Sequence, residues 1–324
     1  MPVIDGEHLE QLKLYRRPRG QIIFANLVLK ADYRFPRRTS IKIEGIENLP
    51  ATGGAILAMN HTDRFNYWPF QYQMYRHGLP FTATWVKGKY YENAFMTWFL
   101  NQTNNIPLPS RGYLLTTSFR EHAGRVPSGD EYRYLRDLTN AVDVADRTCS
   151  DEISSLLGES PEDFAAEFEA RFEALMRKVM ALNSRAVHEL GLNLLVFPEG
   201  TRSVTLKPGH TGLVEVSQFL QLPIIPVGCN GSNHLYPGNS PLSKGGDVVY
   251  RVGPPLPVDG PELSPHRIVD DAVPFSRRIK QDHGDKLEAM TKIVMRRIAA
   301  LLDPEYQSSA EDDGDAGAGS ARFV

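Results

Sequence analysis

Two short segments of this chain carry the residue types that proton transfer and anion binding require. The first segment, Asn60 to Asn66 (NHTDRFN), directly follows the apolar run Ala55 to Met59. Histidine titrates near neutral pH, so His61 is a candidate general base that removes a proton from an alcohol. Its Nε2 atom works as a base only when Nδ1 donates to a fixed acceptor. Asn66 and Asp63 are both candidates for that acceptor.

The second segment, Phe197 to Ser203 (FPEGTRS), is a candidate anion clamp. Gly200 permits a ligand to approach the backbone closely, and Thr201 adds a hydroxyl. The planar guanidinium of Arg202 matches the geometry of a phosphate. Arg111 follows an apolar run and is a second candidate ligand for the same anion. The alternative interpretation is a salt-bridged turn that is purely structural.

Both segments follow runs that predict buried β-strands. Ala55 to Met59 and Leu192 to Phe197 are continuously apolar, as in strands that are covered on both faces. In an open α/β sheet, ligands gather where such strands end. Further strands are predicted at Ser40 to Gly45, Pro223 to Val227 and Asp247 to Val252, and residues 67–110 predict helix, strand, helix, strand. The predicted fold class is α/β.

Helical patterns occupy much of the remaining chain. Ser160 followed by Pro161 is a typical helix start, and the apolar positions from Phe164 to Val179 recur at helical spacing. Gly191 is expected to end this helix, and His283 to Leu302 predict a last amphipathic helix. An aromatic cluster is expected to lie mostly in the core; its members are Tyr90, Tyr91, Phe95, Met96, Trp98, Phe99 and Leu100.

Composition limits the classes of partner. The 324 residues carry a formal net charge of -3, which argues against nucleic acid as a partner. Two distant cysteines, Cys149 and Cys229, give no metal-binding spacing and no disulfide framework. We see no signal peptide and no run of about 18 apolar residues, so we expect a cytoplasmic protein whose membrane contact is peripheral.

The chain divides into three parts. Residues 1–38 form a basic, amphipathic N-terminal arm that either lies on an anionic bilayer or packs on the domain. Residues 39–305 form the main domain, in which about 112–190 are helical. Residues 306–324 are rich in Ser, Gly, Asp, Glu and Ala and are expected to be a disordered acidic tail.

The ordered motifs resemble those of the glycerolipid acyltransferases, of the lysophosphatidate (1-acylglycerol-3-phosphate) acyltransferase type. That family carries an Asn-His-(four residues)-Asp block, a block ending in Arg, the Phe-Pro-Glu-Gly-Thr-Arg-Ser block and an Ile-Pro-Val-type block. Here these correspond to Asn60-His61, Arg111, Phe197 to Ser203 and Ile225-Pro226-Val227. The resemblance covers roughly residues 38–260.

The resemblance implies a fold, a reaction and a set of roles. The fold would be a glycerol-3-phosphate acyltransferase-like mixed β-sheet flanked by helices. His61 would be the general base, and the phosphate ligands would be Glu199, Gly200, Thr201 and Arg202 together with Arg111. The acyl donor would be a thioester of coenzyme A or acyl carrier protein, used as a co-substrate, with no metal or other cofactor. Partners would be a lysophospholipid and the inner face of a membrane, in phospholipid biosynthesis or remodelling.

Two departures from the family pattern leave alternatives open. The family aspartate is Asn66 here, and a neutral amide can orient a histidine but cannot stabilise an imidazolium by charge. The chain is therefore an active O-acyltransferase, a lipid-binding or scaffold protein with impaired turnover, or an enzyme for another acceptor alcohol. We expect Asn66→Asp to keep or raise activity. Residues 112–190 are longer than the usual connection, and we interpret them as an inserted helical cover.

Overall fold

Seven strands form one sheet in the order β1-β7-β6-β2-β5-β3-β4 in a computed structural model that describes residues 4–238 and 240–307. The strands are β1 (Thr39–Glu44), β2 (Ile56–Met59), β3 (Thr82–Lys87), β4 (Asn105–Leu108), β5 (Asn193–Val196), β6 (Ile224–Asn230) and β7 (Gly246–Val252). All neighbouring pairs are parallel except β6 and β7, which are antiparallel. The predicted mixed α/β fold is confirmed.

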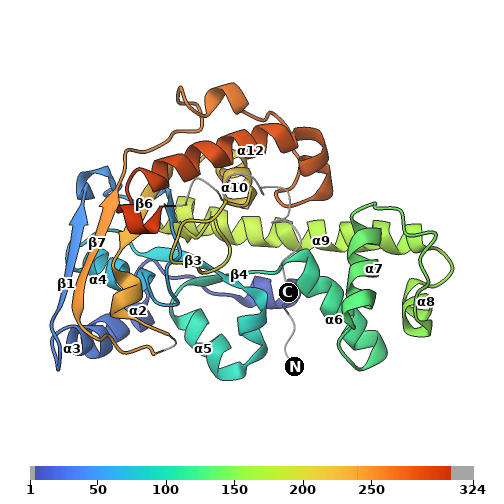
Figure 1. Ribbon diagram of the computed structural model, residues 1–324, viewed down its shortest axis with the longest axis horizontal. Helices are drawn as coiled ribbons and strands as arrows, with labels where there is room; N and C mark the ends of the chain where they lie inside the picture. The colour runs from blue at the N-terminus through green and yellow to red at the C-terminus, as the bar shows by residue number, and fades with distance from the viewer. Residues whose placement is uncertain (1–3, 239, 308–324) are drawn as a thin grey trace.

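Alternate side chains of the central strand β2 enter two separate cores. Ile56 and Ala58 belong to a core that includes side chains of α9 (Pro161–Ser184), α10 (Gly212–Leu220) and α12 (Arg277–Ala299). Leu57 and Met59 belong to the opposite core, which is closed by α4 (Tyr67–Arg76) and η1 (Phe24–Leu29). Helices therefore cover both faces of the sheet (Figure 1), which explains why β2 is apolar at every position.

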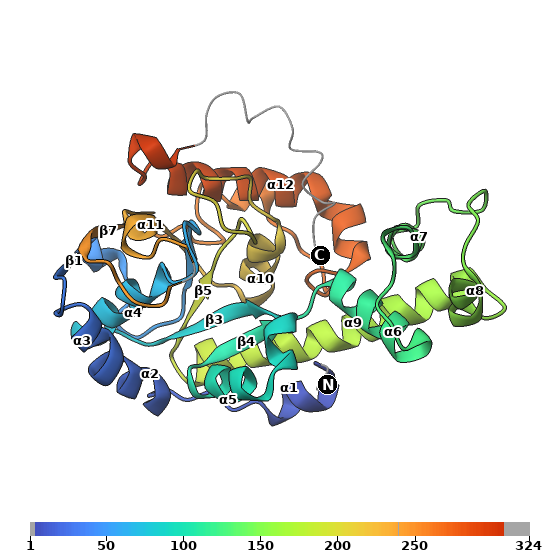
Figure 2. The same ribbon diagram turned by 60° about the horizontal axis from the view of Figure 1, so that its bottom comes forward.

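The remaining helices surround the sheet and the helices that cover it. They are α1 (Gly6–Gln11), α2 (Arg19–Ile23), α3 (Lys30–Asp32), α5 (Ala94–Gln102), α6 (Arg111–Ala123), α7 (Gly129–Thr139), α8 (Asp151–Leu157) and α11 (Ser232–Leu235), with π-helical η4 (Arg185–Glu189) after α9 and the short 3-10 turns η2 (Ile46–Asn48), η3 (Gly88–Glu92), η5 (Ser264–His266) and η6 (Pro304–Tyr306). Helices α7 and α8 project beyond the sheet at one end of the molecule (Figures 1 and 2).

The start of α9 agrees with the prediction from the sequence, and the start of α12 does not. The hydroxyl of Ser160 accepts a hydrogen bond from the backbone N–H of Asp163, so Ser160 is the predicted N-cap. Helix α12 begins at Arg277, earlier than the predicted start at His283. Ser276 caps an additional turn, and His283 marks a kink inside the helix. The polar sequence of that first turn gave no apolar periodicity to detect.

The N-terminal residues pack on the domain while keeping an apolar side outward. Leu9, Leu12 and Leu14 are buried in one core, and Ala25 and Leu29 are buried in the other. The exposed side presents other apolar side chains, at Ile23, Leu27 and Val28. The basic side chains of this segment are also exposed; they belong to Lys13, Arg16, Arg17, Arg19, Lys30, Arg34, Arg37 and Arg38.

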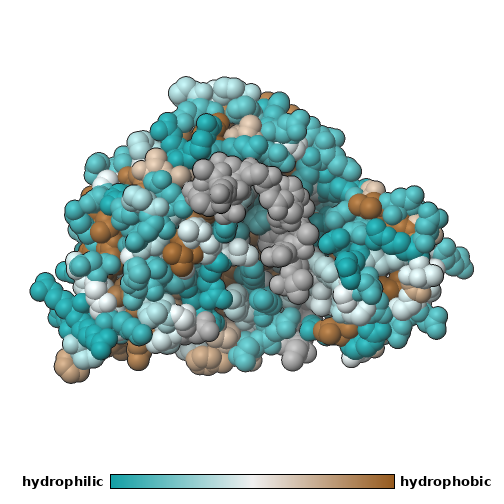
Figure 3. Space-filling view, viewed as in Figure 1, coloured by the Kyte–Doolittle hydropathy of each residue, from teal (hydrophilic) through white to brown (hydrophobic). Residues whose placement is uncertain are grey.

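The expectation that the aromatic cluster of residues 90–100 is mostly core is wrong. Tyr91 and Leu100 are buried, but Phe95 and Trp98 are 69% and 59% exposed. The physical reason is that α5 lies on the outside of the sheet and contacts α2 there, so only part of its apolar surface is covered. Figure 2 shows α2 and α5 at the same lower face, and Figure 3 shows apolar side chains along that rim.

Candidate functional site

Neighbouring strands bring the two motif segments together. β2 and β5 pair in parallel, so His61 and Glu199 both follow the carboxyl ends of adjacent strands. The backbone N–H of His61 donates to Oε1 of Glu199 (2.7 Å), and the backbone N–H of Ser203 donates to the carbonyl oxygen of His61 (2.9 Å). Two hydrogen bonds thus join segments that are 138 residues apart in the sequence.

Glu199 holds two backbone segments of the site together. Its carboxylate is 2% exposed and accepts a second backbone N–H, that of Lys207, through Oε2 (2.9 Å). Burial raises the pKa of Glu199 to about 7, although the two backbone N–H groups act in the opposite direction. Both oxygens are therefore committed to positioning the backbone of His61 and of the loop after the turn.

The ring of His61 is oriented by Asn66. Nδ1 of His61 lies 3.1 Å from Oδ1 of Asn66, and Nδ2 of Asn66 lies 2.8 Å from the carbonyl oxygen of Asn60. A carbonyl oxygen can only accept, so the atom facing it must be the amide nitrogen. Oδ1 then faces Nδ1, which must carry the proton. This tautomer leaves the lone pair on Nε2, as a general base requires.

Asn66 itself is held from two further directions. The side chain of Asn60 pairs with β6, donating from Nδ2 to the carbonyl oxygen of Cys229 (3.0 Å) and accepting at Oδ1 from its N–H (2.7 Å). The hydroxyl of Tyr250, on β7, donates to the backbone carbonyl oxygen of Asn66 (2.5 Å). Asn60, Asn66 and Tyr250 are all buried, so the position of the ring depends on three strands of the sheet.

An aromatic contact fixes the plane of the histidine. The ring of Phe197 stacks on that of His61 with 4.1 Å between centroids and 19° between planes, and Tyr67 packs edge-on against Phe197. Burial lowers the pKa of His61 to about 4, the hydrogen bond that its Nδ1 donates to Asn66 partly opposes this, and the charges of Arg202 and Lys87 add to the lowering. The imidazole is therefore neutral at physiological pH.

Asp63, the other candidate for orienting the histidine, serves the turn instead. Oδ1 of Asp63 accepts from the backbone N–H of Phe65 (2.8 Å), and Oδ2 accepts from the hydroxyl of Thr62 (3.0 Å). Burial raises the pKa of Asp63. The structure thus resolves the alternative left open by the sequence in favour of Asn66.

The turn after β5 presents its cation outward. Gly200 adopts φ of +63°, a conformation that favours glycine, and its N–H donates to the carbonyl oxygen of Phe197 (3.1 Å). This tight turn leaves Thr201 and Arg202 exposed. Because the charge of Arg202 lowers the pKa of both His61 and Asp63, the guanidinium is near both side chains.

Arg111 makes its contacts within the helical segment. It pairs with Glu169 of α9 (2.5 Å) and donates to the carbonyl oxygen of Thr139 (2.9 Å). Its guanidinium also lies over the rings of Phe168 and Phe172, 5.2 and 5.1 Å from their centroids. The structure therefore brings His61, Asn66, Glu199 and Arg202 together, while the contacts of Arg111 tie α6 to α9.

Lys87 is a site residue that the sequence reasoning missed. It ends β3, which is the neighbour of β5, and burial followed by the charges of Lys89 and Arg202 lowers its pKa. A basic residue directly after the run Thr82 to Val86 is the same signal that identified His61 after β2. That signal is visible in the sequence, but the order of the strands is needed to place it beside the site.

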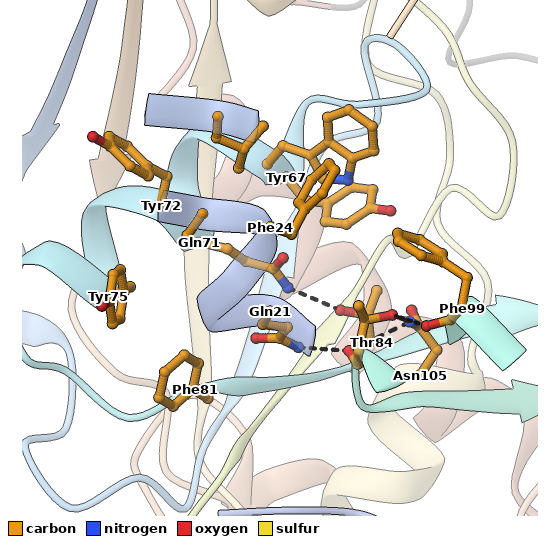
Figure 4. Close-up of a pocket in the computed structure, with 14 residues that line it drawn as sticks. Gln21, Phe24, Tyr67, Gln71, Tyr72, Tyr75, Phe81, Thr84, Phe99 and Asn105 are labelled. Carbon is orange, nitrogen blue, oxygen red and sulfur yellow. Dashed lines mark hydrogen bonds between the residues drawn. The ribbon is translucent and has the colours of Figure 1, made fainter. Parts of the chain in front are cut away.

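A small cavity lies beside the site, between η1, α4, α5 and the sheet (Figure 4). It encloses about 40 Å³, which is close to the volume of one water molecule. Phe24, Tyr67 and Phe99 line it together with the amide of Gln71, which donates to the hydroxyl of Thr84 (3.2 Å). Such a volume does not accommodate a long acyl chain.

Comparison with known proteins shows a local similarity to acyltransferases. The acyltransferase family model matches residues 157–230, which run from α8 to β6 and include the whole Phe197 to Ser203 turn. A 1-acyl-sn-glycerol-3-phosphate acyltransferase of Cocos nucifera is 32% identical over 78 residues, 24% of this chain and 25% of the relative. This part of the chain is thus similar to acyltransferases. An uncharacterised acyltransferase of Schizosaccharomyces pombe is 29% identical over 87 residues, 26% of this chain and 31% of the relative.

These sequence matches are local. The chain spans about a third or less of the length of these two relatives. Among solved structures, the 1-acyl-sn-glycerophosphate (LPA) acyltransferase of Thermotoga maritima aligns over 91% of this chain and 87% of its own. The TM-score of that alignment is 0.43 and the sequence identity is 16%.

We predict that His61 titrates far below an ordinary histidine. Its neutral form is favoured by burial and by two nearby cations, so the pKa should lie near 4 and not near 6.5. NMR titration of the imidazole protons measures it, and the signal is assigned by its absence in His61→Gln. An apparent pKa of 6 or above would contradict the burial of the ring described here.

Proposed function

We propose that this protein is an O-acyltransferase that moves a fatty acyl group from a thioester donor to the hydroxyl of a glycerol phosphate or lysophospholipid. The observation that carries the proposal is the hydrogen bond from Nδ1 of His61 to Asn66, beside a turn that exposes Arg202. This arrangement supplies a neutral base and a phosphate ligand in one place. The related 1-acyl-sn-glycerol-3-phosphate acyltransferase sequence supports the choice of acceptor.

The reaction requires a single proton acceptor. Nε2 of His61 takes the proton of the acceptor hydroxyl as its oxygen attacks the thioester carbonyl carbon. The tetrahedral intermediate collapses, the carbon–sulfur bond breaks, and the thiolate of coenzyme A or acyl carrier protein takes the proton from His61. The low pKa of His61 keeps the ring unprotonated between turnovers, so the base is always ready. Asn66 holds the ring but adds no charge to the imidazolium.

The turn after β5 is the proposed site of the acceptor phosphate. Arg202 provides a planar, bidentate cation, and Gly200 leaves the backbone open to an approaching oxygen. Glu199 contributes by holding this turn against His61 and not by touching the anion, because both of its oxygens accept backbone N–H groups. The distance between base and anion ligand is thereby fixed for one acceptor geometry.

A membrane surface is the proposed source of the lipid. Exposed apolar side chains of two adjoining segments form what we call the α2–α5 face; they are Ile23, Leu27, Val28, Phe95 and Trp98. Exposed arginines and lysines precede and follow Ile23 to Val28 in the sequence, which suits an anionic bilayer. Within residues 4–238 and 240–307, no helix has both the length and the apolarity needed to cross a membrane.

We predict that His61→Ala abolishes acyl transfer. Loss of a positioned general base costs about 10²–10⁴ in kcat. Release of free thiol from a long-chain acyl-CoA in the presence of lysophosphatidate, with the lipid product identified by mass spectrometry, measures it. Equal turnover by His61→Ala would overturn the assignment of the base. Lipid binding without any transfer by the parent protein would favour the alternative of an impaired, lipid-binding family member.

The hydrogen bond from Asn66 to Asn60 changes the expectation for Asn66→Asp. An aspartate would place a carboxylate oxygen where the amide N–H now meets the carbonyl oxygen of Asn60, 2.8 Å away. A buried donor replaced by a second acceptor costs about 1–3 kcal/mol. We now predict that Asn66→Asp lowers both kcat and the free energy of unfolding, measured by the same assay and by urea denaturation. A kcat equal to or above that of the parent would contradict the orientation of the Asn66 amide.

We predict that Leu27→Glu weakens membrane binding. Leu27 is 71% exposed at the α2–α5 face, and a carboxylate there opposes both burial in lipid and attraction to an anionic surface. Co-flotation with vesicles of phosphatidylglycerol and phosphatidylcholine measures binding. Val126→Glu is the matched control, because Val126 is 60% exposed and lies between α6 and α7, away from this face. Equal losses in both variants would argue against a specific face.

A further inference from the structure

Arg111 is engaged in a network that excludes it from the turn after β5. Its guanidinium lies between two aromatic rings, pairs with the carboxylate of Glu169, and donates to a backbone carbonyl. The Arg111 and Glu169 side chains are only 18% and 15% exposed. Removing Arg111 from this network to bind a substrate anion would leave Glu169 partly buried without its cation, which is costly.

The same carboxylate holds the start of α12. Oε2 of Glu169 meets Arg111, while Oε1 accepts from the backbone N–H of Arg277, the first residue of that helix (2.8 Å). Glu169 is therefore a junction between α6, α9 and α12. Glu169 pairs with Arg111 and so keeps that cation away from the edge of the sheet. It also anchors the first turn of α12, which carries another cation, Lys280.

Two contacts place that first turn over the edge of the sheet near the site. Phe275, just before the turn, packs on Trp85 of β3 with 6.1 Å between ring centroids. The backbone N–H of Phe275 also donates to the carboxylate of Glu215 on α10 (2.5 Å). Lys87 lies two residues beyond Trp85, on the same face of β3. Lys280 and Lys87 thus approach the site from two elements.

His210 lies in the loop between the turn after β5 and α10. Its backbone N–H donates to the carbonyl oxygen of Pro198, which fixes it against the turn (2.8 Å). Burial lowers the pKa of His210, and the charges of Lys280 and Lys87 lower it further. Both lysines thus act electrostatically on His210, in keeping with the placement of the first turn of α12 beside β3. Lys87 in turn acts on His61 together with Arg202.

We propose that Lys280 and His210 complete the binding site for the acceptor's phosphate, beside Arg202 and Lys87, and that they take the place of Arg111. The inference rests on the proposed function for the identity of the acceptor. A phosphate monoester carries up to two negative charges and three oxygens that accept hydrogen bonds. Two lysines and one arginine supply enough positive charge to neutralise it, and together with an imidazole N–H they supply donors for all three oxygens.

Binding of glycerol 3-phosphate, followed by calorimetry, tests the proposal without requiring turnover. Lys280→Ala and His210→Gln should each weaken binding about tenfold, as expected for loss of a hydrogen bond to a charged group. Lys280→Arg should retain it. Lys292→Ala, which removes an exposed lysine further along α12, is the matched control and should leave binding unchanged. Unchanged affinity in Lys280→Ala and His210→Gln, or no binding by the parent protein, overturns the proposal.

A variant of Arg111 provides a second test of the proposed phosphate site. Arg111→Lys retains the charge and should affect the melting temperature more than the affinity for glycerol 3-phosphate, because its partners are within the helical segment. A large loss of affinity at an unchanged melting temperature would return Arg111 to the phosphate site and contradict the inference.

Turnover separates this inference from the proposed function. With lysophosphatidate as acceptor, Lys280→Ala should raise KM about tenfold and leave kcat little changed, because Lys280 contacts the anion and not the reacting atoms. Phosphate binding that depends on Lys280 in a protein without acyl transfer would contradict the proposed function alone. Acyl transfer to lysophosphatidate with a KM that is indifferent to Lys280 and His210 would contradict the inference alone.

Discussion

The arrangement of the site depends on the two hydrogen bonds that the carboxylate of Glu199 accepts. This carboxylate is nearly inaccessible to solvent, yet it accepts one backbone N–H from the segment after β2 and another from the loop after β5. A buried carboxylate is costly unless it is hydrogen-bonded, and here its two oxygens stabilise two chain segments at once. The position of His61 relative to Arg202 follows from this bridge. Glu199 belongs to the Phe197 to Ser203 segment, which was predicted to bind an anion. Its own role is to hold that segment against His61, the proposed base.

The histidine is tuned by burial and by geometry, without a charged partner. In a carboxylate–histidine pair, the carboxylate both orients the ring and stabilises the imidazolium. Asn66 keeps the first role, and its amide is itself oriented by the carbonyl oxygen of Asn60. Phe197 covers one face of the ring, and nearby cations disfavour a positive charge on it. The consequence is an imidazole that remains neutral at physiological pH and holds a proton weakly, which suits the proposed step in which the proton passes on to the leaving thiolate.

The helical segment between β4 and β5 does more than cover the sheet. Its long helix α9 carries Glu169, which connects Arg111 to the first residue of α12. A carboxylate with two partly buried partners is a strong constraint, because removing either partner leaves charge or a hydrogen-bonding group unsatisfied. The cations available to a ligand at the edge of the sheet are therefore decided by packing some distance from the turn after β5. The apolar α2–α5 face lies on another side of the fold from α12, so the proposed lipid contact and the proposed phosphate site are separate surfaces.

The sequence by itself determined the α/β class, most strands, the start of α9 and the two segments that carry chemistry, because apolar runs and turn residues act locally. It also identified His61, and the family resemblance rested on the Phe197 to Ser203 string. The partner of the His61 ring, the commitment of Arg111 to Glu169 and the exposure of Phe95 and Trp98 were decided only by the tertiary structure. Each of these depends on which elements are neighbours in space. The sequence leaves both Asn66 and Asp63 as candidates to orient the ring of His61. In the structure, Asn66 contacts Nδ1 of His61, and the carbonyl oxygen of Asn60, 2.8 Å from Nδ2 of Asn66, fixes the orientation of its amide. Likewise, an arginine after a strand is a ligand or a structural cation according to what packs beside it, and α9 supplies that partner from 58 residues away.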